Sequence, residues 1–441
     1  MDNISPKTPI ADMLKRYEEE KNIRFHMPGH KGRAKFSEFA CMNEVVTYDV
    51  TEVMGTDNLH EPKEAILQAE QLLAKAYGAN KSFLLVNGAT CGILAAVGAA
   101  FESGDRVIVD ENCHRSVYDA LGLFGAIACI MKITFSGLAD MTANDENIKG
   151  VIITRPDYYG NCLDISKISD LCREQNLILI TDEAHGAHLK FAQLGYPVSA
   201  VEYSDFTIQS AHKTIGALNQ SAYLHLCNRG KAYEGKIRRM LSIFQTSSPS
   251  YLILASGDCA RAFMQERGSE LLEELRDNIN WVSNEIEINT PFKVERKLGK
   301  TPDRLVINTG VAGLLGYDVE RYLRSRSITL EMADSERIVC LCSVFDKRED
   351  FEKLADELKE ITCNKDIVSK YNESCRNEER RIVISELAEY IGEAVTSDVV
   401  KYPPGIPIVK CGEILTTDKY NIIKELYLSG AEIMGIPRKD T

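Results

Sequence analysis

The sequence predicts an α/β fold in which a large unit with a mainly parallel sheet is followed by a smaller α+β unit. In the first part of the chain, short apolar segments typical of strands alternate with segments of helical periodicity. The strand segments are nearly continuous apolar runs, which is the pattern of strands buried on both faces of a parallel sheet. After about Asn280 this regular alternation ends.

The expected elements of the large unit can be placed in order. Residues from Met1 to Val46 are expected to form an arm with one short helix and a break at Pro28–Gly29. Apolar residues recur at helical spacing from Ala65 to Ala76, and the small residues from Ala89 to Ala100 predict a second helix. Strands are expected at residues 82–86, 106–109, 127–131, 151–154, 177–181 and 206–208.

The smaller unit is expected to combine short strands with two helices. Its strands are predicted at 292–294, 304–307 and 338–341, its helices at 319–324 and 351–361, and residues 364–380 read as a polar connector. The predicted domains are an arm at 1–46, a large domain at 47–280, a small α+β domain at 281–362 and a C-terminal subdomain at 363–441.

The composition limits the classes of function. The 441 residues are 44% hydrophobic and 27% charged, which is typical of a soluble globular protein. A net charge of −13 argues against a nucleic-acid partner, because phosphate binding needs a basic face. The acidic balance either attracts cationic substrates or serves solubility alone.

The cysteines and the terminal segment point to the cytoplasm. The 13 cysteines are scattered without a CxxC pair, so we expect neither a metal cluster nor a disulfide framework. The N-terminal segment is charged and predicts no signal peptide. No run reaches the roughly 20 apolar residues of a membrane span, so we expect no membrane partner.

Lys213 is the first candidate catalytic residue. It lies in the segment Ser210–Thr214 (SAHKT), directly after the expected strand at 206–208. A lysine among small and hydroxyl residues at the end of a buried strand differs from a surface lysine. Schiff-base chemistry needs an amine that can be neutral, and partial burial lowers the pKa of a lysine.

Asp182 follows the expected strand at 177–181 and begins the segment Asp182–Gly186 (DEAHG). A carboxylate at a strand end can pair with the pyridine nitrogen of pyridoxal 5′-phosphate (PLP) and keep it protonated. Ala184, two residues further on, points the same way and is small enough for a ring to lie over it. The alternatives are a helix N-cap or a metal-binding aspartate, and the sequence has no phosphate-binding loop upstream to support the metal.

Two further segments follow strands. Asn87–Thr90 joins a strand to a helix whose free backbone N–H groups can bind an anion, with the Thr90 hydroxyl as a further donor. The alternative is an ordinary N-cap. His114 follows the strand at 106–109 and could stack on a planar cofactor or be a plain loop histidine.

We expect these four segments at consecutive strand ends of one sheet, and their joint occurrence is more specific than any one of them. In combination they resemble the ornithine/lysine/arginine decarboxylase family of fold-type I PLP enzymes, whose large domain is aspartate aminotransferase-like. The resemblance covers nearly the whole chain, and the segments that carry it are 25–32 (FHMPGHKG), 49–52 (DVTE), 85–88 (LVNG), 158–160 (YYG), 182–188 (DEAHGAH), 210–217 (SAHKTIGA), 247–251 (SSPSY), 402–407 (YPPGIP) and 412–413 (GE).

The resemblance implies a role for each site residue. Lys213 would hold the cofactor as a Schiff base, Asp182 would pair with the pyridine nitrogen, and His114 would stack in front of the ring. The other residues implied in cofactor binding are Ala184 and His185 near the ring, and Ala89, Thr90, Ser210 and His212 at the phosphate.

The resemblance also implies a homodimer with shared active sites. Thr246 would reach the phosphate of the neighbouring subunit, whereas Tyr158 and Glu413 would lie near the substrate. The implied reaction is α-decarboxylation of arginine, lysine or ornithine to an amine and carbon dioxide, as in polyamine biosynthesis.

Two rival functions share this fold. An aminotransferase would clamp the substrate α-carboxylate with an arginine such as Arg337, and a regulator would keep a catalytically silent PLP site. Two departures from the family stand out. Cys411 replaces the usual proline before Gly412–Glu413, so the local turn can differ, and the chain resembles the short form without the N-terminal wing domain.

Overall fold

The structure is a computed structural model that describes residues 7–33, 42–145, 147–193, 195–297, 299–363, 378–402 and 406–437. Its contacts divide the chain into two compact units. The first comprises Met1–Asp157 and Asn161–Glu273, and the second comprises Tyr158–Gly160 and Glu274–Thr441. The finer division of the second unit into 281–362 and 363–441 stays a prediction.

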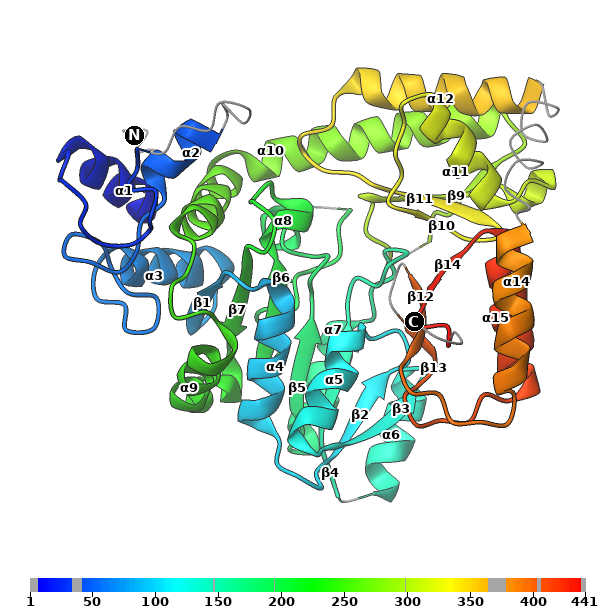
Figure 1. The fold of residues 1–441 in the computed structure, drawn as a ribbon, viewed down its shortest axis with the longest axis horizontal. Coiled ribbons are helices and arrows are strands. Elements are labelled where there is room, and N and C mark those ends of the chain that lie inside the picture. The colour runs from blue at the N-terminus through cyan, green and yellow to red at the C-terminus, as the bar shows by residue number, and fades with distance from the viewer. Residues whose placement is uncertain are drawn as a thin grey trace. The chain divides into compact units, whose positions relative to one another are not determined.

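A seven-stranded sheet forms the centre of the first unit (Figure 1). Neighbouring strands among β2 to β6 pair in parallel, whereas β7 runs antiparallel between β1 and β6. The predicted mainly parallel sheet is therefore confirmed. In spatial order the strands are β1 (Lys81–Leu85), β7 (Ala222–Leu226), β6 (Phe206–Ser210), β5 (Ile178–Asp182), β4 (Ile148–Thr154), β2 (Arg106–Asp110) and β3 (Ile127–Met131).

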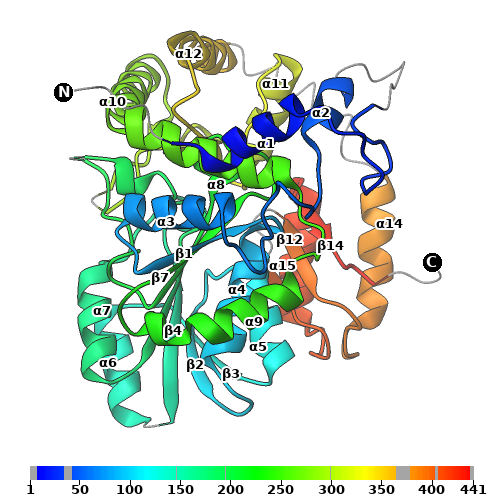
Figure 2. The ribbon, with the colours of Figure 1, turned by 90° about the vertical axis from the view of Figure 1, so that its left-hand side faces the viewer.

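Helices cover both faces of this sheet. Figure 2 shows α6 and α7 on one side, and α4, α5 and α9 on the other. Along β2, Val107 and Val109 pack into the core with α4 and α5, whereas Ile108 packs into the opposite core with α6 and α7. The helices of this unit are α1 (Pro9–Glu19), α2 (Met42–Tyr48), α3 (Ala65–Tyr77), α4 (Gly88–Ala100), α5 (Arg115–Phe124), α6 (Phe135–Asn144), α7 (Ile165–Glu174), α8 (Ala211–Thr214) and α9 (Glu234–Phe244).

Two features of the first unit differ from the sequence prediction. β7 was not expected, because its sequence AYLHL carries a buried histidine, His225, that breaks the apolar run. The arm contains a second helix, α2, in addition to the one predicted helix, α1. Residues 1–6 and 34–41 of the arm lie outside the described residues.

The candidate segments lie in one sheet but not at consecutive strand ends. β7 separates β1 from β6, and β4 separates β5 from β2. The prediction of consecutive positions was therefore wrong, because order along the chain does not fix the order of strands in a sheet. The ends of β5 and β6, which carry Asp182 and Ser210, are direct neighbours.

The second unit contains two smaller antiparallel sheets with the strand orders β10-β11-β9-β8 and β13-β12-β14. The long helix α10 (Tyr251–Asn289) begins in the first unit and contains the predicted boundary at residue 280. The strands are β8 (Lys293–Val294), β9 (Arg304–Asn308), β10 (Met332–Ala333), β11 (Arg337–Leu341), β12 (Val399–Tyr402), β13 (Ile406–Val409) and β14 (Glu432–Met434). The helices are α11 (Gly316–Ser325), α12 (Arg348–Cys363), α14 (Glu378–Leu387) and α15 (Thr417–Ser429).

No helix within the described ranges is both long and apolar enough to cross a membrane. Of the polar connector predicted at 364–380, residues 364–377 lie outside the described part of the chain.

Candidate active site

Lys213 lies in α8, a single helical turn that follows β6 directly. This short turn brings the lysine back over the carboxyl end of the sheet, where ligands of parallel sheets bind. Its Nζ atom lies 3.2 Å from Nε2 of His185, a buried residue in the turn after β5. The side chain is half-buried, so its amine is partly withdrawn from water.

Asp182 is the last residue of β5 and is 4% exposed. Its Oδ1 atom accepts a hydrogen bond from the backbone N–H of Ala184 at 3.1 Å. Among the described residues no other donor reaches this carboxylate, so Oδ2 keeps its capacity to accept a hydrogen bond. Ala184 is itself buried, and its methyl group adds little bulk beside the carboxylate.

His114 caps the N-terminus of α5, the helix that follows β2. Its Nδ1 atom accepts a hydrogen bond from the backbone N–H of Ser116 at 3.2 Å, so we infer that the proton of the neutral ring is on Nε2. Burial lowers the pKa of His114, Asp182 opposes this shift, and Lys213 adds to it. His114 therefore lies close enough to Asp182 and Lys213 for both charges to act on its ring.

The first turn of α4 provides backbone N–H groups without a side-chain cap. Gly88 begins the helix at a φ of 73°, a left-handed conformation that favours glycine, and donates its N–H to Gln220 O at 2.8 Å. The Asn87 side chain does not cap the helix. Ala89 is half-buried and Thr90 is exposed, so both are accessible in this turn.

Ser210 and His212 lie on either side of the start of α8. Ser210 is 1% exposed at the end of β6. The Nδ1 atom of His212 lies 3.1 Å from Ser221 O and donates to it, which leaves Nε2 unprotonated in the neutral ring. Burial lowers the pKa of His212, and Lys213 lowers it further. A bound phosphate would favour protonation of Nε2, because an opposite charge stabilises the imidazolium.

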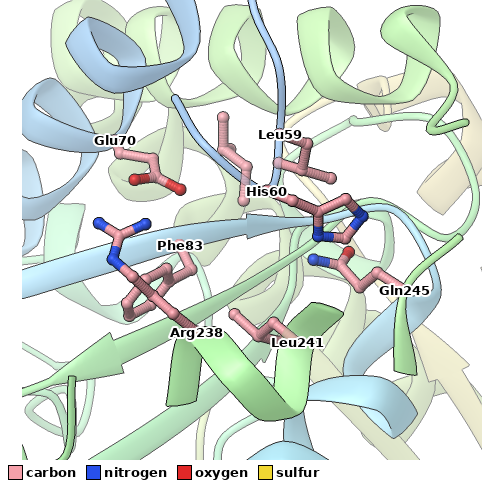
Figure 3. Close-up of a pocket in the computed structure, with 8 residues that line it drawn as sticks. Leu59, His60, Glu70, Phe83, Arg238, Leu241 and Gln245 are labelled. Atoms are coloured by element: carbon pink, nitrogen blue, oxygen red, sulfur yellow. The ribbon is translucent and has the colours of Figure 1, made fainter. Parts of the chain in front are cut away.

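Thr246 is held beside the first turn of α4 of its own chain. Its backbone N–H lies 3.4 Å from Asn87 Oδ1, and its carbonyl accepts a hydrogen bond from His60 Nε2 at 2.9 Å. The neighbouring Gln245 accepts the Val86 N–H at 2.8 Å. Figure 3 shows His60 and Gln245 together on the wall of a pocket. Whether Thr246 reaches the phosphate of a partner subunit stays a prediction.

The two predicted substrate residues belong to the second unit. Tyr158 packs on a small apolar cluster that contains Val306 and Met332. Glu413 accepts hydrogen bonds from Lys410 N at 3.0 Å and Lys419 Nζ at 2.6 Å, and these two donors lower the pKa of its carboxyl. Their roles toward a substrate stay predictions.

Cys411, which stands where the family usually has proline, lies in the turn before Glu413. The backbone N–H of Cys411 donates to Asp398 Oδ1 at 2.7 Å, a bond that proline cannot make. The sulfur of Cys411 lies 3.2 Å from Thr396 O. The 403–405 stretch of the preceding motif lies outside the described residues.

Arg337, the possible carboxylate clamp, is already engaged. Its Nε and Nη2 atoms each donate to Asp334 Oδ2 at 2.9 Å, and its Nη1 lies 3.6 Å from a carboxylate oxygen of Glu295. The guanidinium also stacks on the ring of Tyr159, with 4.2 Å to the ring centroid. Two carboxylates therefore neutralise Arg337 within the second unit.

One cluster next to the candidate site was missed by sequence reasoning. Glu183, directly after Asp182, is fully buried and pairs with Arg155. The available signal was a second carboxylate after an apolar strand, together with an arginine at the end of the preceding strand segment. The sequence could not reveal that the two meet, because they lie on different strands.

A family comparison identifies the relatives of this chain. The family model described as the major domain of the Orn/Lys/Arg decarboxylases matches residues 8–139 and 132–298. The chain belongs to this family. An arginine decarboxylase of Bacillus subtilis is 29% identical, with 97% of this chain and 95% of that protein covered. The constitutive lysine decarboxylase of Escherichia coli is 24% identical over 60% of this chain.

Solved structures of other proteins share the fold. The lysine decarboxylase LdcF of Francisella novicida has a TM-score of 0.83 and 18% identity, with 98% of this chain and 80% of that chain covered. A structure of SPT with PLP covers 67% of this chain and 75% of that chain with a TM-score of 0.55 at 13% identity. This Orn/Lys/Arg decarboxylase family member therefore has the fold-type I architecture that its sequence predicted.

Proposed function

We propose that the protein binds PLP through Lys213 and decarboxylates a basic amino acid, arginine, lysine or ornithine, at its α-carbon. The observation that carries this proposal is the convergence of Lys213, Asp182 and His114 at the carboxyl ends of three strands of one sheet. The family membership supports the reaction class.

The residues around Lys213 fit the proposed cofactor. Asp182 Oδ2 has the capacity to accept a hydrogen bond from a pyridine N–H, and Ala184 leaves room beside it. The first turn of α4 offers uncapped N–H groups suited to a phosphate, and Ser210 and His212 are near Lys213 in sequence and structure. When bound, PLP supplies an electron sink for the bond that breaks at the α-carbon.

Each site residue then has a defined task. Asp182 would hold the proton on the pyridine nitrogen, since a buried carboxylate stabilises that charge. His114, neutral at physiological pH because burial lowers its pKa, would present a flat uncharged ring to the cofactor. Lys213 Nζ would bind the cofactor and release it when a substrate amine takes its place.

The geometry of Arg337 favours decarboxylation over amine transfer. An aminotransferase uses an arginine to bind the substrate α-carboxylate, whereas a decarboxylase gains when that carboxylate is poorly solvated. The guanidinium of Arg337 already pairs with Asp334 and Glu295. A substrate carboxylate would have to displace one of these partners.

The finer parts of the proposal concern the oligomeric state, the cellular compartment and the metabolic role of the enzyme. We propose a cytoplasmic homodimer with shared active sites, because the family resemblance implies that Thr246 reaches the active site of the partner subunit. Isologous dimers are the commonest oligomers of soluble proteins. The amine product would suit polyamine biosynthesis.

One experiment tests the proposed function directly. The purified, PLP-loaded protein is incubated with arginine, lysine and ornithine in turn, and the amine product is identified by mass spectrometry. Release of one amine with carbon dioxide supports the proposal. Amine transfer that depends on an added keto acid would favour an aminotransferase, and bound PLP without turnover of any basic amino acid would favour a silent regulator.

A further inference from the structure

Glu183 is a buried carboxylate surrounded by hydrogen-bond donors. It is 0% exposed. Its Oε1 atom accepts from Arg155 Nη1 at 3.2 Å and from the backbone N–H of Ala200 at 2.7 Å. Its Oε2 atom accepts from Ser199 Oγ at 2.8 Å and from Gln209 Nε2 at 2.7 Å. All four groups act as donors and oppose the rise that burial causes in the pKa of Glu183. Their convergence suits an ionised carboxylate.

The hydrogen bonds continue from Glu183 across the sheet. Because Gln209 donates its amide to Glu183, its Oε1 atom faces His225 Nε2 at 3.1 Å and accepts from it. Burial lowers the pKa of His225 to about 3, so the ring is neutral and its Nδ1 accepts from Ser82 Oγ at 2.7 Å. The donor and acceptor directions of the whole chain thus depend on the charge of Glu183.

This network joins neighbouring strands. It links the segment after β4 to the end of β5, then to β6, β7 and β1, which are adjacent in the sheet. It begins at the carboxyl edge, where Glu183 follows Asp182 and Gln209 precedes Ser210. The backbone supports the same junction, since Glu183 N donates to Ile208 O at 2.8 Å and Arg155 N donates to Asp182 O at 2.9 Å.

The chain turns closely around Glu183. A Cβ atom at Gly186 would lie 2.5 Å from Glu183 Cγ, so only glycine fits there. The Gly186 N–H also donates to Glu183 O at 2.8 Å. The turn that carries Ala184 and His185 is therefore shaped around the Glu183 side chain.

We propose that Glu183 is a positioning residue, which holds Asp182 and the Ser210–Lys213 segment in the geometry that the cofactor requires. The inference rests on the proposed function. Consecutive residues at a strand end point to opposite faces, so a fixed Glu183 fixes the direction of Asp182. Through Gln209 it likewise fixes the strand end that leads into Lys213.

The test replaces Glu183 by the isosteric amide in Glu183→Gln. The new NH2 group faces two donors, so Gln209 must rotate its amide and His225 must move its proton from Nε2 to Nδ1. In the apo-protein, nitrogen NMR of the His225 ring should show this change of tautomer. In the PLP-loaded protein we expect weaker PLP binding, an altered absorbance of the lysine-bound cofactor, and a kcat lower by about tenfold or more with little change in KM.

Asp205→Asn provides the matched control. Asp205 is also a buried carboxylate paired with an arginine, Arg229 at 2.9 Å, but it precedes β6 at the opposite edge of the same sheet. We expect this variant to lose stability while it keeps the cofactor absorbance and kcat of the wild type. Equal losses in the two variants, or a Glu183→Gln variant with normal absorbance, PLP affinity and kcat, would overturn the inference.

A double variant separates positioning from stability. If Glu183 acts through Asp182, adding Glu183→Gln to Asp182→Asn should cost much less activity than Glu183→Gln costs alone. Additive losses would contradict the inference. A wild-type protein that forms no lysine-bound cofactor absorbance would refute the proposed function and, with it, this inference, whereas normal wild-type absorbance beside an unaffected Glu183→Gln variant would refute the inference alone.

Discussion

Lys213 and Asp182 are separated by 30 residues of sequence, but Asp182 ends β5 and Lys213 lies in α8, which directly follows the adjacent strand β6. His185 follows Asp182 in the turn after β5, and its Nε2 atom lies 3.2 Å from Lys213 Nζ. At the scale of single residues, the proposed chemistry therefore depends on two groups with separate tasks. In the proposed function, the lysine would form the covalent link and the aspartate would control the charge of the ring.

Lys213→Ala should abolish turnover, because alanine has no amine to form the covalent link. It should also remove the absorbance of the lysine-bound cofactor. Borohydride reduction of the wild type should fix a pyridoxyl group on the peptide that contains Lys213, as detected by mass spectrometry. The matched control is Lys231→Ala, which replaces an exposed lysine of the same unit. This variant should keep both turnover and the absorbance of the lysine-bound cofactor. A label on Lys231 would refute the assignment.

Asp182→Asn should retain some PLP, because the proposed phosphate site is separate from Asp182, but should lose at least ~100-fold in kcat. The amide cannot keep the pyridine nitrogen protonated as a carboxylate does. Steady-state kinetics with the preferred amino acid measure the effect. Asp110→Asn is the control, since Asp110 is a buried carboxylate that ends the strand β2. Near-normal kcat in Asp182→Asn would show that Asp182 is not the partner of the ring.

At the scale of elements, the antiparallel strand β7 introduces a buried polar side chain into the sheet. His225 lies between Ser82 of β1 and Gln209 of β6, and its ring packs 4.6 Å from that of Tyr77. A neutral histidine satisfies both neighbours, because it has one donor and one acceptor. A protonated ring would offer a second donor and lose the acceptor on Nδ1.

Protonation of His225 should make the fold sensitive to acid. Its pKa is about 3 in the folded chain and ordinarily about 6.5, so between these values the unfolded chain binds the proton. Stability is then lost as the pH falls below about 6.5, by about 2 kcal/mol between pH 7 and pH 5 from this group alone. Urea unfolding of the wild type and of His225→Gln at both pH values measures the difference. An equal loss in both proteins would exclude His225 as a cause.

At the scale of the whole molecule, Thr246 distinguishes an active site that is complete within one chain from one that is shared between two subunits. Thr246 lies beside Asn87 of its own chain, and that contact gives the same-chain alternative a structural basis. The family resemblance instead implies that Thr246 serves the partner subunit. The two arrangements predict different behaviour for mixed dimers.

Lys213→Ala and Thr246→Ala should complement each other if the sites are shared. In a mixed dimer one site would carry both lesions and the other neither, so co-refolded mixtures should recover activity above the sum of the separate variants. Thr246→Ser should retain activity, since it keeps the hydroxyl. A merely additive activity, with subunit exchange confirmed independently, would place Thr246 in the site of its own subunit.

The sequence by itself determined the α/β class, most strand positions, and Lys213 and Asp182 as the main candidates. Apolar runs and the residues that follow them are local features, and they need no knowledge of distant contacts. The strand at 206–208, for example, and the lysine after it can be read directly from one short segment.

The tertiary structure alone decided which strands are neighbours and which buried groups meet. The insertion of β7 between β1 and β6, and the Glu183 network that joins Arg155, Gln209 and His225, depend on pairing between segments distant in sequence. A buried carboxylate is stable only where several donors converge on it, and that convergence exists only after the strands have paired.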